Sequence, residues 1–415
     1  MAANPGIVLP GAYSGIAPAA APSGARVVIS PVVRLAFYVF ILSIPFEMPN
    51  RTIPLEIPTI TGSLFLLSTV FSFGTVYRRI PTPLFWFGAW LWFFGLSTLW
   101  NRGDHAGQVA GLFVTFVQLV LLMWAGSSVM RDPRAMRGAL LTFALAVFLR
   151  AALQVLGIGT TYHQEWTGGY RTTLLGQNPN HSAIIMAAGL VAVLNLRLRV
   201  VAWLMAGIIG LALIQTGSRG GLMCAAAGTL VLLWHGRTTW ARVRGVFLGM
   251  LVLGLMAFAA LRSPMLSARF QEVVTEHSLA GRERIYPAVV SMISERPVLG
   301  WGPVENQYEI AQRIGEEKQD RRDAHNLLLE LFSSTGFLGA IPFLVGLTLC
   351  IREAWRARRG RWQMLPFALL MAVLTGSISG TWIAAKVLWF SLAVAIAAGA
   401  YVSRKNTDMG AIACD

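Results

Sequence analysis

The sequence predicts an all-α polytopic membrane protein. Hydrophobic residues occupy 55% of its 415 positions and charged residues only 13%, whereas a typical soluble domain carries about 25% charged residues. The apolar residues are also gathered in long blocks, and many of these approach the roughly 20 residues that cross a bilayer as a helix. Soluble cores seldom contain so many blocks of this length, so we expect about 12 transmembrane helices.

The apolar blocks fall into two groups. Residues 31–262 are expected to hold spans 1–9, and residues 325–402 to hold spans 10–12. Hydropathy places the individual spans at 31–46, 60–76, 83–100, 108–130, 138–157, 180–196, 199–214, 219–235, 244–262, 325–351, 362–379 and 382–402.

Three segments lie outside these spans. Residues 1–30 are rich in Ala, Pro and Gly and form an expected disordered tail, and residues 403–415 form a second tail. Residues 263–324 form a long loop between spans 9 and 10, which we expect to be largely helical. Nine basic residues from Arg262 to Arg322 are balanced by ten acidic ones from Glu272 to Asp323, so the segment is not a polybasic patch for anionic lipids.

Positive charge predicts the orientation of the helices. Every second short loop is rich in arginine, and cytoplasmic loops are the ones enriched in Lys and Arg. Both tails are therefore expected in the cytoplasm, whereas the loop 158–180, the turn 215–220 and the segment 263–324 share the opposite face. The formal charge of +15 is divided among loops and forms no single patch, so we expect no nucleic-acid partner.

A glycine-flanked arginine opens the span at residue 219, in the sequence "TGSRGG". Glycines allow close backbone approach, and a helix start presents free N–H groups and a positive dipole end. With the guanidinium of Arg219, this turn suits a phosphate or diphosphate. The alternative is an arginine that only anchors a helix end at the membrane interface.

The loop contains "GRERIYPAVVSMISERPVLGWGP", which predicts an amphipathic helix. Its apolar face comprises Ile285, Val289, Met292 and Ile293, and Pro297 ends it. Arg282 and Arg284 stand at its start, where they could bind an anion or form an ordinary solvated helix end next to acidic residues.

The sequence "DAHNLLLELF" opens the tenth span. Asp323 suits a helix N-cap, and the dipole at a helix start disfavours a charged imidazole. His325 would then be a neutral histidine at the water boundary, which is what a general base requires. The alternative is a satisfied polar residue at a helix end.

The sequence "GQNPNHSA" starts the sixth span on the same face. Asn178 and Asn180 could hold sugar hydroxyls or phosphate oxygens, or they could be turn and cap residues around Pro179; for Asn178 we favour the turn. We find no metal-ligand spacing, P-loop or dinucleotide fingerprint in the chain. We therefore expect no cofactor and no metal.

Taken together, "GQNPNHSA", "TGSRGG", the loop sequence and "HNLLLELFSSTGFLG" resemble the bacterial O-antigen ligase and O-antigen polymerase superfamily over about residues 170–345. The resemblance implies a C-superfamily glycosyltransferase fold and a metal-independent, inverting enzyme in the bacterial inner membrane with a periplasmic active site. It implies His325 as general base and Arg219 and Arg282 as catalytic arginines. Arg284, Asn178, Asn180 and Asn326 are the expected substrate-binding residues.

The length, the twelve spans and the lack of an added C-terminal domain favour the ligase branch of this superfamily. Such a ligase transfers a glycan from its undecaprenyl-diphosphate-linked donor to a sugar hydroxyl of the lipid A–core acceptor. Membrane lipids are the other expected partners, and we expect a monomer. A polymerase or an O-linked protein glycosyltransferase with the same motifs is the main alternative. A lipid-linked oligosaccharide transporter is a more distant one, because the spans are largely uncharged at their centres.

Overall fold

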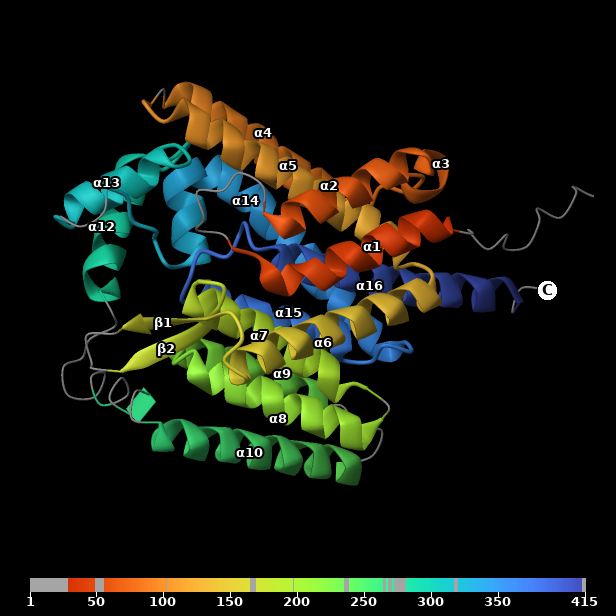
Figure 1. Ribbon diagram of the computed structural model, residues 1–415. Helices are drawn as coiled ribbons and strands as arrows, with labels where there is room; N and C mark the ends of the chain where they lie inside the picture. The colour runs from red at the N-terminus through yellow and green to blue at the C-terminus, as the bar shows by residue number, and fades with distance from the viewer. Residues whose placement is uncertain are drawn as a thin grey trace, which may run out of the picture.

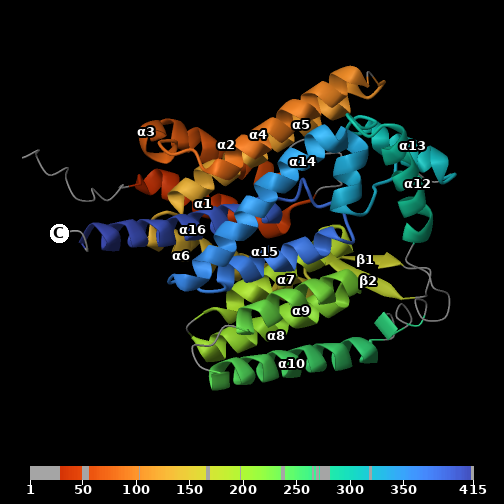
Figure 2. The same ribbon diagram turned by 180° about the vertical axis from the view of Figure 1, so that it is seen from behind.

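The protein forms one bundle of helices in the computed structural model, which describes residues 29–48, 56–101, 103–164, 169–196, 198–234, 239–263, 266–267, 271, 281–316 and 320–412. The long helices lie side by side (Figures 1 and 2). Every predicted apolar block contains a helix. In chain order, the helices are α1 (Pro31–Ser43), η1 (Ile44–Phe46), α2 (Ile57–Val70), α3 (Phe73–Val76), α4 (Thr82–Trp100), α5 (Ala106–Val129), α6 (Pro133–Val155), α7 (Pro179–Leu194), α8 (Arg199–Gln215), α9 (Arg219–Leu233), α10 (Thr239–Arg262), α12 (Arg282–Glu295), α13 (Glu305–Arg313), α14 (Leu327–Arg356), η2 (Ala357–Arg359), α15 (Leu365–Ser377) and α16 (Lys386–Ile412).

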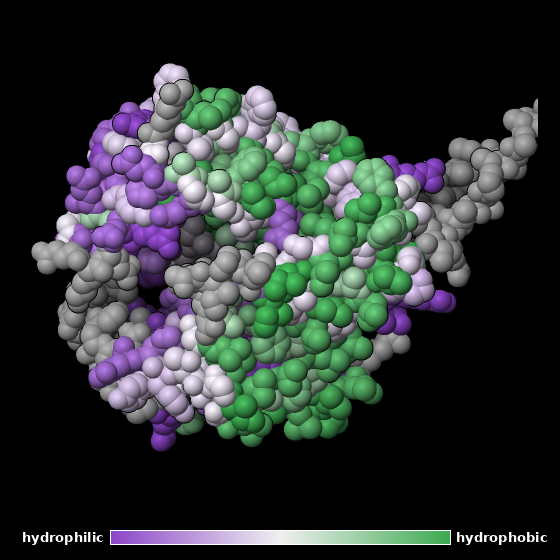
Figure 3. Space-filling model, turned by 45° about the horizontal axis from the view of Figure 1, so that its top comes forward, coloured by the Kyte–Doolittle hydropathy of each residue, from purple (hydrophilic) through white to green (hydrophobic). Residues whose placement is uncertain are grey.

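The bundle has the surface of a membrane protein. Among the described residues, α5, α6 and the helix Leu327–Arg359 are long and apolar enough to cross a bilayer, and several apolar helices are shorter. Hydrophobic residues cover the middle of the face in Figure 3, and hydrophilic residues gather on the side of the molecule that carries α12 and α13. A mostly helical membrane protein is therefore confirmed, whereas the number of twelve spans stays a prediction.

The segments predicted to share one face do lie together, at the end of the bundle that we call the loop end. It carries α12, α13 and a hairpin of strands β1 (Thr160–Gln164) and β2 (Tyr170–Leu174), which pair antiparallel (Figure 1). The rest of the described fold is consistent with the all-α prediction; this short hairpin is the exception, and its Thr and Tyr residues favour strands. Arg171 on β2 donates from Nε to the backbone oxygen of Thr216 at 2.7 Å, which ties the hairpin to the turn before α9.

The amphipathic helix predicted in the long loop is confirmed as α12. Ile285, Val289 and Met292 are buried, and they form a small core with Ile310 of α13 and Ala324. On the exposed side of these two helices, Arg313 of α13 donates to both carboxylate oxygens of Glu295 of α12 at 2.6 Å. Packing of the two short helices against each other thus gives this loop a core separate from that of the bundle.

Helix α14 is interrupted where a turn segment without regular secondary structure, residues 297–302, runs against it. Gly336 has φ 60° and ψ −167° inside the helix. Its neighbour Phe337 donates from its backbone nitrogen to Pro297 at 2.8 Å, and Trp301 donates to Ser333 at 2.8 Å. We call residues 297–302 the strap. A Cβ on Gly336 would collide with the backbone oxygen of Val298, so a glycine is required for this close approach.

The structure describes little of the predicted N-terminal tail and most of the predicted C-terminal one. The predicted disordered tail, residues 1–30, lies outside the described residues except for positions 29 and 30. The C-terminal tail predicted at 403–415 is helical in its described part, because α16 continues to Ile412. Parts of the long loop, at 264–265, 268–270, 272–280 and 317–319, also lie outside the described residues.

Candidate active site

The turn that carries Arg219 is a capped helix start. Ser218 is the N-cap of α9, and its Oγ accepts a hydrogen bond from the backbone nitrogen of Gly221 at 3.1 Å. Arg219 is therefore the first residue of α9, as predicted, at the positive end of the helix dipole. A Cβ on Gly220 would lie 2.9 Å from Oγ of Ser379, so the glycine brings this turn against the loop between α15 and α16.

The two asparagines at the start of α7 have different roles. Asn178 is the N-cap and accepts hydrogen bonds from the backbone nitrogens of Asn180, at 2.9 Å, and His181, at 3.3 Å. This confirms the turn interpretation of Asn178. The Oδ1 of Asn180 accepts from Arg171 at 2.7 Å and from Ser218 at 2.9 Å. Asn180 therefore joins the start of α7 to the turn that holds Arg219.

The start of α12 faces the same loop between α15 and α16. Arg282 donates from Nη2 to the backbone oxygen of Ser379 at 2.8 Å. One turn later, the hydroxyl of Tyr286 lies 3.4 Å from the backbone oxygen of His325 and 3.5 Å from that of Ile378. Arg284 points elsewhere and donates to the backbone oxygen of Ile314 at 2.6 Å, after the end of α13. The structure thus places Arg282, and not Arg284, beside the histidine.

Helix α14 begins at Leu327, two residues later than predicted. The cap is Asn326, whose Oδ1 accepts from the backbone nitrogens of Leu328 at 2.9 Å and Leu329 at 3.2 Å. The prediction of Asp323 as N-cap was therefore wrong. Because Asn326 starts the helix, His325 lies in the turn before it with a positive φ of 50°. The Nδ2 of Asn326 also donates to the backbone oxygen of Ile378 at 3.1 Å.

The imidazole of His325 is held neutral. Burial of the ring, then the positive charges of Arg322 and Arg282, lower the pKa of His325 to about 4. Neither ring nitrogen forms a hydrogen bond to another residue that the structure describes. A neutral, half-buried histidine with an available ring nitrogen can accept a proton from a bound hydroxyl.

Two adjacent residues, Ile378 and Ser379, are the point where these segments meet. Arg282 donates to the backbone oxygen of Ser379, and Asn326 donates to that of Ile378. Gly220 packs against the side chain of Ser379. The sequence analysis missed this loop, which reads "GSISGTW" between two apolar blocks. Its short run of Gly and Ser was the available signal, since small residues let other segments approach closely. The loop brings the turn 216–221, Arg282 and His325 together.

Arg322 is a second residue that the sequence analysis did not single out. Its charge acts on His325 more strongly than that of Arg282, and its Nη1 lies 3.8 Å from Oε2 of Glu316. The burial of Asp323 raises the pKa of that carboxyl, against the opposing charges of Arg321 and Arg322. The two arginines before the histidine in "RRDAH" were the visible signal.

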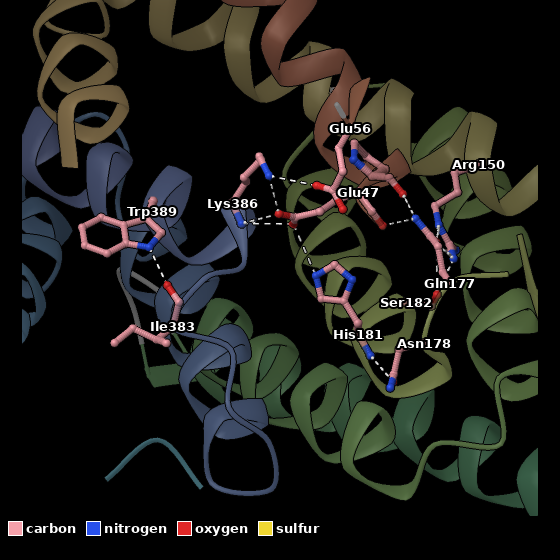
Figure 4. A network of polar contacts seen from close by, with 11 residues as sticks. Glu47, Glu56, Arg150, Gln177, Asn178, His181, Ser182, Ile383, Lys386 and Trp389 are labelled. Atoms are coloured by element: carbon pink, nitrogen blue, oxygen red, sulfur yellow. Dashed lines mark hydrogen bonds and ion pairs between the residues drawn. The ribbon is translucent and has the colours of Figure 1, made fainter. Parts of the chain in front are cut away.

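A buried ion cluster lies next to this site (Figure 4). Lys386, at the start of α16, donates from Nζ to Glu47 at 2.8 Å and to Glu56 at 3.3 Å. His181 is fully buried, with its Nε2 3.4 Å from the second carboxylate oxygen of Glu47, and its ring lies 5.3 Å from that of Trp382. The cluster joins α7, the α1–α2 connection and the loop that contains Ser379.

A second set of buried polar contacts continues from it. Arg150 of α6 is fully buried and donates to Oε1 of Gln177 and, at 2.7 Å, to Oγ of Ser182. Gln177 in turn donates to the backbone oxygens of Pro45 at 3.0 Å and Glu47 at 2.6 Å. Because these donors and acceptors are hydrogen bonded to one another, α6, the start of α7 and the α1–α2 connection are held in fixed relative positions.

Metal ligands are a separate question. Within the described ranges, no group of three or more His, Cys, Asp or Glu residues could hold a metal ion. Metal independence nevertheless stays a prediction about the reaction.

The fold and the site define a polytopic helical membrane protein in which a neutral histidine faces arginine-bearing segments at one end of the bundle. Residues 200–344 match the family described as O-antigen ligase. This segment contains Arg219, all of α12, and His325. The resemblance to the O-antigen ligase superfamily is therefore confirmed over this segment. A search of curated proteins finds no match to the chain.

Proposed function

We propose that this protein is an O-antigen ligase. It would transfer the O-antigen glycan from undecaprenyl diphosphate to a sugar hydroxyl of lipid A–core and so complete lipopolysaccharide. The observation that carries this proposal is the convergence of the turn 216–221, Arg282 and His325 on Ile378 and Ser379. A general base and two cationic segments are the parts that a displacement at a glycosyl diphosphate requires.

The reaction would be a single displacement with His325 as base. The acceptor oxygen loses its proton to the imidazole while it attacks the anomeric carbon of the donor sugar. The bond between that carbon and the diphosphate oxygen breaks, and the diphosphate leaves with the bonding electrons. Because attack and departure take place on opposite faces of the sugar, the anomeric configuration inverts. A low pKa for His325 supports this role, since it leaves the ring unprotonated at neutral pH.

The arginines would stabilise the negative charge of the departing diphosphate. Arg219 stands at a helix start, where the dipole and free backbone N–H groups add to the guanidinium. Arg282 stands at the start of α12 and shares Ser379 with that turn. Asn180 and Asn326 lie beside these residues and are our candidates for contacts to the substrate. Asn178 would support the site through its cap.

Arg284 has a different place in this proposal. Its contact with Ile314 directs it toward α13, so we assign it at most to an outer part of the glycan. Neither its contact nor its position brings it to the reacting centre.

The loop end would face the periplasm, in the bacterial inner membrane. Clustering of the hairpin, the turn 216–221 and the long loop at one end supports the orientation deduced from the arginines. In this orientation both termini are cytoplasmic, twelve helices span the bilayer, and lipids surround a monomer. The donor and the acceptor, both lipid-anchored, would reach the site from the outer leaflet.

The test is a reconstituted transfer reaction. Purified protein is mixed with undecaprenyl-diphosphate-linked glycan and lipid A–core in the presence of EDTA, and the products are separated on a gel. We expect glycan on lipid A–core. Longer lipid-linked chains with an untouched core would instead identify a polymerase. If neither product forms with verified substrates, the ligase proposal fails and a protein acceptor or transport becomes the next hypothesis.

A further inference from the structure

A large cavity lies at the loop end, away from the candidate active site. Its volume is about 940 Å³. It is bounded by the end of α4 and the connection that follows it, by the strap and by α13, and includes Trp100, Trp301, Tyr308 and Glu309 among its lining residues. None of the residues to which we assign catalysis lines it.

Helix α12 sets the distance between this cavity and the reacting centre. Arg282 at its first residue contacts Ser379, whereas Arg296, directly after its last residue, lines the cavity. A helix of 14 residues is roughly 20 Å long at the ordinary rise per residue. A ligand in the cavity would therefore lie several sugar units from the anomeric carbon under attack.

The walls of the cavity combine aromatic faces with polar groups. Trp100 is 76% exposed, so its ring face is accessible to a ligand in the cavity. Tyr308 is stacked on His105 with ring centroids 3.7 Å apart, and Trp301 has the guanidinium of Arg296 3.9 Å from its ring centroid. These rings are thus held in position before any ligand binds.

The polar groups are also held in position. Glu305 accepts from Nδ1 of His105 at 3.0 Å, and Glu309 accepts from Arg313 at 2.6 Å. Asn101 accepts from Arg296 at 2.9 Å and donates to the backbone oxygen of Gly300 at 3.2 Å. Such fixed carboxylates and amides present acceptors and donors at defined places, so a ligand loses little free energy in ordering them.

This combination of groups selects for a carbohydrate. The C–H face of a pyranose packs on an aromatic ring, whose π face is negative, while the sugar hydroxyls donate to carboxylates and accept from amides. The two carboxylates disfavour a diphosphate, and the many polar groups disfavour an acyl chain. A neutral or weakly charged oligosaccharide can therefore contact both the aromatic rings and the polar groups of the lining.

We propose that this cavity is an oligosaccharide-binding site that holds a glycan at a distance from the bond being made. The inference rests on the proposed function for its ligand, which is either the core oligosaccharide of the acceptor or the O-antigen of the donor. Binding there aligns a long glycan along α12 so that its reactive end reaches His325. Longer saccharides therefore bind more tightly than ones too short to reach the cavity.

The experiment measures binding without catalysis. The His325→Ala protein in nanodiscs is titrated with lipid-free core oligosaccharide and, separately, with O-antigen polysaccharide released from its lipid, by calorimetry. Trp100 and Gln312 both line the cavity and are exposed, so Trp100→Ala and Gln312→Ala each remove one group of the lining. We expect each to raise Kd by roughly fivefold to tenfold, the value of one aromatic or polar contact.

Trp240→Ala is the matched control. Trp240 is also 76% exposed, but it lies at the start of α10, at the opposite end of the bundle (Figure 1). It should leave Kd unchanged. A response of the core oligosaccharide alone assigns the cavity to the acceptor, a response of the O-antigen alone assigns it to the donor, and a response of both assigns it to glycans in general.

The proposal is overturned if neither saccharide binds, or if Trp100→Ala and Gln312→Ala behave like Trp240→Ala. Its failure is distinguishable from failure of the ligase proposal, because binding is measured in a protein without the base. Saccharide binding that depends on Trp100 in a protein that transfers nothing would keep the site and reject the ligase. Transfer by the wild type without saccharide binding that depends on Trp100 would keep the ligase proposal and reject the site.

Discussion

The guanidinium of Arg282 donates a hydrogen bond to the backbone oxygen of Ser379, across 97 residues of sequence and at 2.8 Å. This contact joins the first residue of α12 to the loop between α15 and α16. Gly220 packs against the side chain of the same residue. The position of one serine therefore relates two cationic segments to each other, and the predictions below follow from that arrangement.

Removal of the proposed base should abolish transfer. His325→Ala should lower kcat by about 10²- to 10⁴-fold, the usual contribution of a general base, because no other described group takes its place in the turn before α14. The measurement is the rate of glycan transfer to lipid A–core. His163→Ala, in the hairpin at the same end, is the control and should retain activity. Near-normal transfer by His325→Ala would reject the assignment.

The pH profile should report the lowered pKa of His325. The base works when it is unprotonated, so activity is lost as the pH falls through the pKa of about 4, and not near the ordinary histidine value of about 6.5. We expect kcat/KM to be flat from neutral pH down to about pH 5. A fall centred near pH 6.5 would contradict this environment for the ring.

A neighbouring charge should shift that profile. Arg322→Gln removes a positive charge that lowers the pKa of His325, so the acid limb should move to higher pH. Arg321→Gln is the matched control: Arg321 is exposed and hydrogen bonds to Gln108 at 3.2 Å, and its charge has no part in the shift of His325. Equal profiles for both variants would show that Arg322 does not act on the histidine.

The guanidinium fork of Arg219 should be required, beyond its charge. Arg219→Lys keeps the charge but loses the planar pair of donors, and we expect at least a roughly hundredfold loss of kcat, the scale of losing one charge-stabilising donor. Arg199→Lys is the control, because Arg199 is also the first residue of a helix, at the other end of the bundle. Wild-type rates in Arg219→Lys would make it an anchor only.

The contact between Gly220 and Ser379 should be detectable as a coupling. Gly220→Ala places a Cβ 2.9 Å from Oγ of Ser379, which should displace the turn and lower the transfer rate. Ser379→Ala alone should have little effect, because the backbone oxygen that Arg282 uses remains. The double variant should regain activity relative to Gly220→Ala, as expected for two residues in contact. Additive losses would mean that the two positions are independent.

Breaking the buried ion cluster should reduce stability. Lys386→Met removes the lysine partner of the buried Glu47 and leaves it with the ring of His181, and removal of one member of a buried pair costs about 3–5 kcal/mol. Thermal unfolding in detergent would show this as a lower melting temperature, with partial recovery in the double variant Lys386→Met, Glu47→Gln. Arg359→Met, an exposed position, should melt like the wild type. The cluster has no structural role if Lys386→Met does the same.

Sequence patterns predicted the helices well because membrane helices are specified locally. A long apolar block is sufficient to predict a helix, and the arginine-rich loops predict which helix ends lie on the same face of the bundle. The sequence of α12 also has a visible amphipathic period. The cap of α14 was misplaced because Asp323 and Asn326 are both good cap residues, and the choice depends on contacts with Ile378. Helix periodicity also gave no warning of the short hairpin between α6 and α7.

The site itself was only partly predictable. Arg219, Arg282 and His325 each stand at a helix start, which local sequence reveals. Their meeting point does not have a local signature, because Ile378 and Ser379 contribute backbone oxygens, and a backbone oxygen accepts hydrogen bonds whatever the side chain. The cavity at the strap likewise depends on long-range packing, since Trp100 and Trp301 come from segments about 200 residues apart.

The break in α14 at Gly336 has a consequence for how the protein tolerates different bilayers. A continuous helix that tilts to match a thicker or thinner membrane would move both of its ends. Here the strap is hydrogen bonded to residues on both sides of Gly336, to Ser333 and Ser334 before it and to Phe337 and Leu338 after it, so the break itself is fixed to the loop end. We therefore expect the start of α14 to keep its place against the strap when bilayer thickness changes, so reconstitution in lipids of different chain length should leave the acid limb of the pH profile of His325 in place.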